Sequence, residues 1–223
     1  MNNQFSIAID GPVGAGKSTI AKLVAKKLNI IYIDTGAMYR AVGLYVVRKG
    51  FDVKNSDEVK SVLDEINLDV RLSNDGQTIF LNGEDVTNLI RTPEISMAAS
   101  AVSAVSEVRE KLVEMQREMA SSKSVVMDGR DIGTVVLPNA TTKIFLTASL
   151  DTRADRRYKE LIRKGQSVTI EDVKNDIIKR DNNDMSREAS PLKQADDAIL
   201  LDSTGKTLDE VVLEVIGYVK KSV

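Results

Sequence analysis

The 223-residue chain contains no cysteine, no histidine and no tryptophan, and only 4% of its residues are aromatic. These absences exclude disulfides, thiolate nucleophiles, zinc sites with cysteine or histidine ligands, and Ser-His-Asp triads. Any chemistry must therefore use lysine, arginine, carboxylates, hydroxyls, backbone amides or a hard metal ion. The lack of cysteine is compatible with a reducing compartment, and we expect a cytoplasmic protein.

The chain also lacks a strong charge of either sign. With 31 Lys+Arg against 33 Asp+Glu, its formal net charge is −2, so no general basic field attracts nucleic acid or an anionic membrane. The first apolar run, Phe5 to Ile9, is short and ends at Asp10, which fits neither a signal peptide nor a membrane span. We therefore expect no nucleic-acid partner and no membrane association.

Five apolar runs predict buried strands, at residues 5–9, 30–33, 125–127, 144–146 and 198–201. They are continuous rather than alternating, which is typical of parallel strands covered on both faces by crossover helices. Apolar residues at helical spacing predict a helix that starts near Lys17 and ends before Ile30. Thr207 and Glu210 form a capping box that starts a final amphipathic helix. The pattern indicates an α/β fold.

Two stretches depart from this alternation. Residues 68–86 contain short β-like pieces around Asn74-Asp75-Gly76, and Asp-Gly turns favour hairpins, so we expect a small antiparallel insert. The segment from Asp151 to Asp184 is dominated by charge, and Gly165 separates two helical segments within it. Because no linker is evident, we expect insertions into one domain over residues 1–223.

The segment after the first apolar run matches the phosphate-loop pattern G-x-x-x-x-G-K-[ST]. Its glycines let backbone N–H groups turn toward one anion, and the following helix N-terminus adds partial positive charge. Lys17 can reach the β- and γ-phosphates, and the Ser18 hydroxyl can ligate Mg²⁺. A plain glycine turn does not explain the flanking strand and helix. The predicted ATP-binding residues are Gly11, Pro12, Val13, Gly14, Ala15, Gly16, Lys17, Ser18 and Thr19.

A phosphate loop does not by itself name a function, since switches, motors and kinases share it. A GTPase would need the guanine-reading pattern [NT]-K-x-D, which the sequence lacks. A kinase of a small anionic acceptor should have several arginines that converge on a second phosphate. Such arginines stand near predicted strand ends or in the charged segment: Arg40, Arg130, Arg153, Arg156, Arg157, Arg180 and Arg187.

Arg40 and Arg130 are the best placed of these arginines, because open α/β sheets bind ligands at the carboxyl ends of their strands. Arg153, Arg156 and Arg157 share one helix face by their spacing. Three cations without interleaved acids are unfavourable there unless an anion meets them, and ordinary solvation is the alternative.

Together these segments resemble the bacterial cytidylate kinase (CMP kinase) family. The resemblance covers the chain in order and rests on the phosphate loop, Asp34-Thr35-Gly36-Ala37-Met38-Tyr39-Arg40, Asp128-Gly129-Arg130-Asp131-Ile132-Gly133-Thr134, and Arg180-Asp181-Asn182-Asn183-Asp184 with Arg187. It implies a three-layer P-loop NTPase core with a parallel sheet. It also implies a small antiparallel β-containing monophosphate-binding insert around residues 36–110 and a short helical lid around residues 151–168.

The resemblance implies transfer of the γ-phosphoryl group of ATP to CMP and dCMP, with Mg²⁺ held at Ser18 and a chain that acts as a monomer. The implied catalytic residues are Lys17, Arg130, Arg153 and Arg157. The implied CMP-binding residues are Asp34, Thr35, Arg40, Ser100, Arg109, Arg130, Asp131, Arg180, Asp184 and Arg187. A kinase of another monophosphate such as UMP, or an ATP-binding switch without transfer, remains the alternative.

Within this set, the resemblance assigns the acceptor phosphate to Arg40, Arg130 and Arg187, and the pentose to Arg180 and Asp184. Arg153 and Arg157 would belong to the lid over the donor phosphates.

The cytosine would be read by Ser100, Arg109 and Asp131. Ser100 and Arg109 are nine residues apart, roughly 900° on a straight helix, and so would lie on opposite faces. If both contact one base, the helix must break between Ser103 and Ser106, with Ser106 capping the next helix. The alternative is one long helix with Ser100 packed and Arg109 solvated.

We expect Arg130→Ala or Arg187→Ala to lower kcat/KM for CMP by at least about tenfold, because each change removes a charge-assisted bond to the acceptor phosphate. Steady-state kinetics with varied CMP measure this. Turnover at the wild-type rate would show that the acceptor phosphate binds elsewhere.

Overall fold

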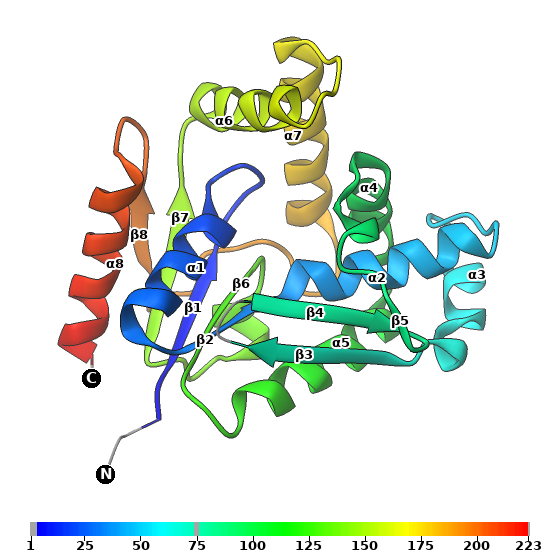
Figure 1. Ribbon diagram of the computed structural model, residues 1–223, viewed down its shortest axis with the longest axis horizontal. Coiled ribbons are helices and arrows are strands. Elements are labelled where there is room, and N and C mark those ends of the chain that lie inside the picture. Colours follow the sequence, from blue (N-terminus) through cyan, green and yellow to red (C-terminus); the bar gives the residue numbers. More distant parts are fainter. Residues whose placement is uncertain (1–3, 74–75, 223) are drawn as a thin grey trace.

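The computed structural model describes residues 4–73 and 76–222. Its main sheet is parallel, with strand order β2-β6-β1-β7-β8. The strands are β1 (Ser6–Asp10), β2 (Ile31–Asp34), β6 (Val125–Gly129), β7 (Thr142–Thr147) and β8 (Ile199–Asp202). Each predicted apolar run forms one of these strands, so the predicted α/β fold with a parallel sheet is confirmed (Figure 1).

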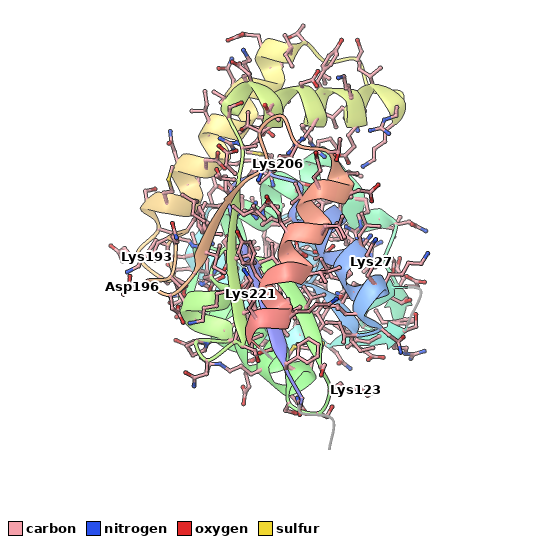
Figure 2. The ribbon with its side chains drawn as sticks, turned by 90° about the vertical axis from the view of Figure 1, so that its left-hand side faces the viewer. Lys27, Lys123, Lys193, Asp196, Lys206 and Lys221 are labelled. Atoms are coloured by element: carbon pink, nitrogen blue, oxygen red, sulfur yellow. The ribbon has the colours of Figure 1, made fainter. Side chains whose placement is uncertain are left out.

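Side-chain alternation along β1 divides the core into two halves. Ile7 and Ile9 pack with helices α1 (Lys17–Leu28) and α8 (Leu208–Ser222), whereas Ala8 packs with α5 (Ser106–Ala120) on the other face. The sheet is therefore the middle of three layers. Figure 2 looks onto α8, where Lys221 stands on the outer surface, as Lys27 does on α1.

The predicted capping box before α8 is confirmed. The backbone N–H of Glu210 donates to the Thr207 hydroxyl, and the backbone N–H of Thr207 donates to the Glu210 carboxylate. Across the part of the chain that the structure describes, no helix is both long enough and apolar enough to cross a membrane.

The chain between β2 and β6 folds beside the main sheet. It contains α2 (Thr35–Arg48), α3 (Ser56–Ser61), η1 (Leu63–Glu65), η2 (Leu89–Arg91) and α4 (Pro93–Val102), and it ends in α5. A second, antiparallel sheet consists of β3 (Leu68–Ser73), β4 (Gly76–Leu81) and β5 (Glu84–Asp85). The predicted pairing of β3 with β4 is confirmed, while Asn74 and Asp75 of the predicted turn lie outside the described residues. The boundaries of the insert, 36–110, stay a prediction.

Two helices lie above the carboxyl ends of β1 and β7 (Figure 1), namely α6 (Leu150–Arg163) and α7 (Ile170–Ser186). Gly165 between them has φ 76°, a left-handed conformation that glycine adopts without steric cost. The predicted separation of two helical segments is therefore confirmed. The predicted lid, residues 151–168, covers most of α6 and its connection to α7, and its separate movement stays a prediction.

The chain breaks between α4, which ends at Val102, and α5, which begins at Ser106. The predicted break is thus confirmed, and one long helix is excluded. The predicted capping by Ser106 is wrong, because Val105 is the N-cap residue and the Ser106 hydroxyl donates to Glu107. Ser106 already lies inside the first turn, one position too late to accept the orphan N–H groups as a cap does.

We expect Leu112→Ala to lower the free energy of unfolding by about 2–5 kcal/mol, because the change opens a cavity in a packed core. Leu112 lies in α5 and is 1% exposed, whereas Leu213 in α8 is 60% exposed. Leu213→Ala is the matched control and should change stability by no more than about 0.5 kcal/mol. Urea unfolding measures both, and equal losses would contradict the described core.

Candidate functional site

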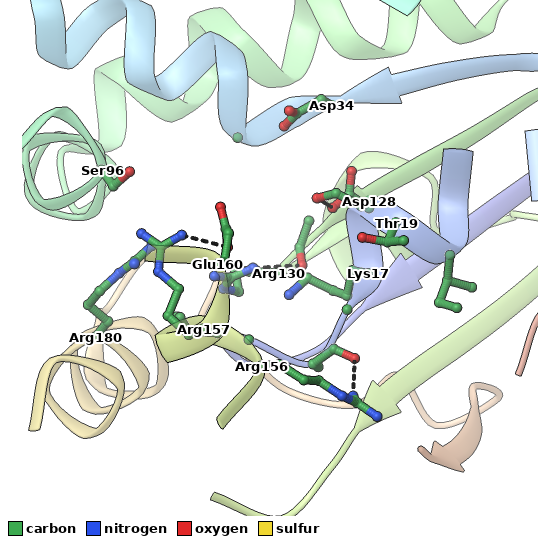
Figure 3. Close-up of a pocket in the computed structure, with 18 of the residues that line it drawn as sticks. Lys17, Thr19, Asp34, Ser96, Asp128, Arg130, Arg156, Arg157, Glu160 and Arg180 are labelled. Atoms are coloured by element: carbon green, nitrogen blue, oxygen red, sulfur yellow. Dashed lines mark hydrogen bonds and ion pairs between the residues drawn. The ribbon is translucent and has the colours of Figure 1, made fainter. Parts of the chain in front are cut away.

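A cavity of about 820 Å³ opens at the carboxyl ends of β1, β2 and β6. Its walls come from the phosphate loop, the start of α2, the junction of α4 with α5, and the helices α6 and α7. Figure 3 shows cationic and acidic side chains from these segments around one space. Parallel strands place their carboxyl ends at one edge, which is where open α/β sheets bind ligands.

The phosphate loop forms one wall of this cavity, and α1 begins at Lys17 as predicted. Gly14 and Gly16 have φ 77° and 94°, a backbone conformation that side chains other than glycine rarely adopt. The buried Lys17 ammonium donates to the Pro12 carbonyl at 2.8 Å. Burial, followed by the charge of Arg130, lowers the pKa of Lys17 to about 7. A polyphosphate at the loop would restore the full charge of this lysine.

Next to the loop, a carboxylate and a hydroxyl form an oxygen-rich position. The Ser18 hydroxyl donates to one oxygen of Asp128 and the Tyr32 hydroxyl to the other, each at 2.7 Å. Burial, followed by the charge of Asp34, raises the pKa of Asp128. A cation would relieve this cost, and these hard oxygens are the ligand type that Mg²⁺ takes together with phosphates. Ser18 and Asp128 therefore fit the predicted cofactor.

Among residues 4–73 and 76–222, no three acidic side chains are grouped so that they could hold a metal ion by themselves.

Asp34 anchors the start of α2. Its carboxylate accepts hydrogen bonds of 2.9 Å from the Ala37 N–H, from Arg40 and from Arg91. Burial alone would raise its pKa, but the charges of Arg40 and Arg91 outweigh burial and hold the pKa of Asp34 below its ordinary value. Gln77 of β4 pairs with the backbone N–H and C=O of Asp34 at 2.9 and 3.1 Å. These contacts attach the antiparallel sheet to β2, the edge strand of the main sheet.

The predicted base-reading residues meet at the junction of α4 with α5. Arg109 and Asp131 form an ion pair in which both side chains are almost fully buried. The Arg109 guanidinium lies 5.5 Å from the centre of the Tyr39 ring. Ser100 and Arg187 line the same cavity. The structure thus brings Ser100, Arg109 and Asp131 together.

Several buried polar atoms of this wall have no hydrogen-bond partner within the described residues. They are the Tyr39 hydroxyl, Nε of Arg40, the Ser100 hydroxyl, Nε of Arg109, Nε of Arg180 and one terminal nitrogen of Arg187. All six residues line the cavity. Leaving a buried donor unpaired costs about 1–3 kcal/mol, so this wall is built for a polar ligand.

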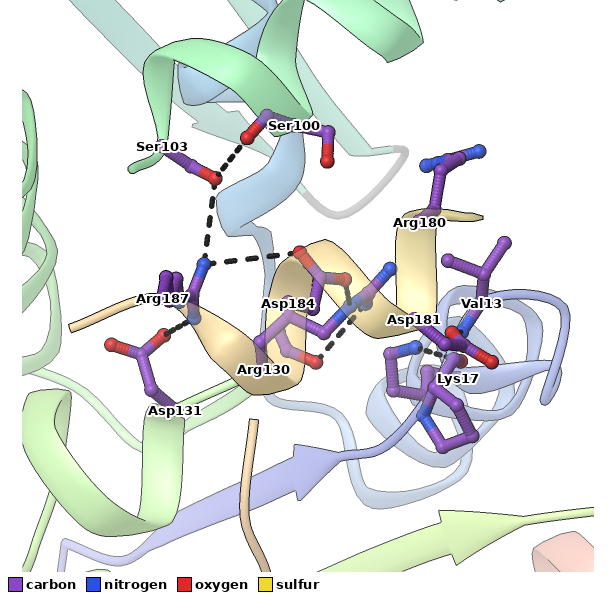
Figure 4. A network of polar contacts seen from close by, with 12 residues as sticks. Val13, Lys17, Ser100, Ser103, Arg130, Asp131, Arg180, Asp181, Asp184 and Arg187 are labelled. Carbon is purple, nitrogen blue, oxygen red and sulfur yellow. Dashed lines mark hydrogen bonds and ion pairs between the residues drawn. The ribbon is translucent and has the colours of Figure 1, made fainter. Parts of the chain in front are cut away.

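Of the residues predicted to bind the phosphate and the pentose, Arg130, Arg180 and Arg187 lie near Asp184 of α7 (Figure 4). Arg40 instead pairs with Asp34. Arg130 donates to the Asp184 carboxylate at 2.6 Å, and Arg187 approaches it to 3.9 Å. Arg180 lies 3.7 Å from Asp176, and burial followed by the charge of Arg130 lowers the pKa of Arg180. Three guanidinium groups thus gather near one central carboxylate, which favours binding of an anion.

The arginines of α6 have different environments. Arg157 lines the cavity and pairs with Glu160 at 2.9 Å. Arg156 also lines it and donates to the Ala15 carbonyl. The sequence predicted it among the arginines that converge on an anion, although the resemblance gave it no role. Arg153 instead pairs with a protein carboxylate, Asp181, and is not part of the cavity wall among the described residues. Its predicted contact with the donor phosphates stays a prediction.

Of the remaining predicted residues, Thr35 lines the cavity and its hydroxyl donates to the Asp128 carbonyl at 2.7 Å. Gly11 and Pro12 complete the phosphate loop at the end of β1. Sequence reasoning missed Gln77 and Arg91, which belong to no motif. It also missed the metal-binding fit of Asp128, although its place directly after the apolar run 125–127 could have indicated one.

A model of the family described as Cytidylate kinase matches residues 7–221. The chain is 52% identical over 220 residues to a protein named Cytidylate kinase from Caldicellulosiruptor bescii, covering 99% of this chain and 97% of that protein. It is 47% identical over 222 residues to one of the same name from Bacillus cytotoxicus, covering 100% and 99%.

Two solved structures share the fold. An uncharacterized protein from Eubacterium ventriosum has a TM-score of 0.55 at 18% identity, covering 98% of this chain and 99% of that chain. A sugar kinase from Janibacter sp. HTCC2649 has a TM-score of 0.51 at 12% identity, covering 98% and 95%. At these identities the likeness extends to the fold alone.

We expect ATP binding at pH 8 to take up close to one proton per site. Lys17, with a pKa of about 7, is mostly neutral there before binding, and the bound phosphates favour its charged form. Calorimetry in buffers of different ionisation enthalpy, without Mg²⁺, measures the uptake. Lys17→Arg is the control, because arginine stays protonated and its uptake should vanish. Equal uptake by both proteins would contradict the low pKa of Lys17.

Proposed function

The chain belongs to the cytidylate kinase family, and we propose on this premise that it transfers the γ-phosphoryl group of ATP to CMP, giving ADP and CDP. One observation of the structure carries the proposal. Among the described residues, six with unpaired buried polar atoms line the cavity that the phosphate loop also lines. Such a cavity suits a polar, anionic acceptor held next to a donor triphosphate.

Two of the unpaired groups, together with Asp131, are complementary to cytosine. The Asp131 carboxylate can accept from the exocyclic amine, while the Ser100 hydroxyl and Nε of Arg109 can donate to the ring nitrogen and carbonyl. Uracil presents a carbonyl oxygen where cytosine presents the amine, and that oxygen would face the Asp131 carboxylate. This arrangement favours CMP over UMP.

The rest of the acceptor is assigned by the same reasoning. Arg40, Arg130 and Arg187 would hold the monophosphate, since they are cations that line the cavity. Arg180 and Asp184 would contact the pentose between base and phosphate. dCMP should be a second acceptor, because it shares the cytosine and the phosphate with CMP.

The attacking atom is an oxygen of the CMP phosphate, whose second pKa is about 6, so no strong general base is needed. Catalysis of phosphoryl transfer depends instead on positioning and on stabilising charge. Lys17, Arg130 and Arg157 would supply positive charge around the transferred group, and the cavity wall would exclude water. Ser18 and Asp128 would hold Mg²⁺, which neutralises charge on the donor phosphates when bound.

The proposed function also assigns roles to two segments of the chain. The segment around 36–110 would act as the monophosphate-binding part and residues 151–168 as a lid within one domain. A monomer would suffice, because every residue assigned above comes from one chain. A cytoplasmic enzyme would meet ATP, the common intracellular phosphoryl donor. The rival readings are a kinase of another small anion and an ATP-binding switch, and neither accounts for a base-complementary set beside the phosphate loop.

We expect ADP release with ATP and Mg²⁺ to be fastest with CMP, slower with UMP, and weak without any acceptor, because the catalytic groups close around the phosphoryl group only when the acceptor is bound. A coupled assay across a panel of monophosphates and shikimate measures this. Stoichiometric ATP binding without turnover on any acceptor would favour a switch. Rapid hydrolysis that CMP fails to redirect would contradict a kinase.

Asp131→Asn tests the base assignment within the same assay. The asparagine amide can present a donor to uracil, so the preference for CMP over UMP should fall while ATP binding persists. An unchanged ranking of acceptors would remove Asp131 from the proposed base-reading set.

A further inference from the structure

Both backbone polar groups of Val13, in the middle of the phosphate loop, are bound by side chains from α6 and α7. The Val13 N–H donates to Asp181 at 2.9 Å, and the Val13 carbonyl accepts from Arg153 at 2.9 Å. Asp181 and Arg153 also pair with each other, and both side chains are mostly buried. Figure 4 shows Asp181 pointing from α7 toward Val13 and Lys17.

Packing reinforces this attachment. The Val13 side chain is 5% exposed and lies in an apolar cluster with Ala154 of α6 and with Val173 and Ile177 of α7. A Cβ added at Gly14 would lie 3.1 Å from both Cβ and the carbonyl oxygen of Arg153. The loop therefore has no room to shift unless α6 and α7 shift with it.

The same helix, α7, carries residues of the acceptor wall. Asp184 is one turn beyond Asp181, about 4.5 Å along the axis, and it binds Arg130. Arg180, next to Asp181 in sequence, lines the cavity with Asp184. One rigid helix thus contacts the acceptor wall with Arg180 and Asp184 and the donor loop with Asp181.

We propose that Asp181 is a positioning residue of the phosphate loop and that, through Asp181 and Arg153, α7 couples acceptor binding to donor binding. The inference rests on the proposed function. Anion binding by the loop requires its N–H groups to point at one place, and the Asp181 carboxylate fixes one residue of that loop. A ligand that contacts Arg180 and Asp184 would fix the position of α7. Through Asp181, it would then also fix the position of the phosphate loop. Coupling of this kind is reciprocal, so ATP should tighten CMP binding by the same factor.

The test measures the Kd of a non-hydrolysable ATP analogue by calorimetry, with and without saturating CMP. In the wild type we expect CMP to lower this Kd by at least about fivefold, the lower end of typical couplings. Asp181→Ala should reduce the ratio to near one and raise the Kd without CMP by about tenfold, the effect of losing a charged hydrogen bond. Asp181→Asn keeps an acceptor oxygen for Val13 and should retain an intermediate ratio.

Lys174→Ala is the matched control. It also removes an ion pair between α6 and α7, because Lys174 binds Asp151 at 2.7 Å on the exposed side of these helices. Its coupling ratio should match that of the wild type. Thermal melting checks the fold of each variant, and if Asp181→Ala does not fold, Asp181→Asn decides.

A wild-type enzyme that phosphorylates CMP but shows a ratio of one would overturn the coupling and leave the kinase function intact. Loss of the ratio in Lys174→Ala, or a wild-type ratio in Asp181→Asn together with wild-type Kd in Asp181→Ala, would remove Asp181 from the role. Lack of CMP turnover in the wild type would instead count against the proposed function.

Discussion

The whole site depends on guanidinium groups that stay buried with too few anions to neutralise them. Burial, together with the neighbouring charge of Arg130, lowers the pKa of Arg180, and burial with the charge of Arg109 does the same for Arg187. Cations in this state bind a phosphate with little competing hydration. The cost is offset by Asp184, by the other carboxylates of the site and by the apolar core around them. The carboxylates thus hold the arginines in place without cancelling their charge.

The parts of the structure that were predictable from the sequence are those that neighbouring residues determine. The strands and the phosphate loop follow from local patterns, since continuous apolar runs and a glycine spacing are properties of neighbouring residues. The contact between Val13 and Asp181 joins residues 168 positions apart, and no local pattern indicates it. The pairing of Gln77 with the Asp34 backbone is equally invisible, because a glutamine in a short amphipathic strand has no distinctive spacing.

Arg153 also shows that the partner of a charged side chain cannot be predicted from sequence spacing. The sequence predicts three cations on one face of a helix, met either by an anion or by ordinary solvation. The structure supplies a protein carboxylate, Asp181, to Arg153, whereas Arg156 and Arg157 line the cavity. A spacing rule places side chains on a face, but only the tertiary fold decides which anion each cation meets. The error at Ser106 has a similar origin, since a one-residue shift of the helix start moves a serine from cap to first turn.

The absence of histidine is consistent with a reaction that depends on positioning and charge rather than on a general base. A reaction whose nucleophile is already an anion needs no group that takes up a proton near neutral pH, and its barrier lies in bringing like charges together. Lys17 fits the same account, because burial and the charge of Arg130 lower its pKa, and it needs no role as a base. When phosphates enter, the same burial strengthens their attraction to the charged lysine. In the empty site, the low-dielectric cavity makes it costly to keep Lys17 charged. In the filled site, the same cavity strengthens the attraction between the cations and the phosphates. This difference allows a chain of ordinary composition to hold two polyanions side by side.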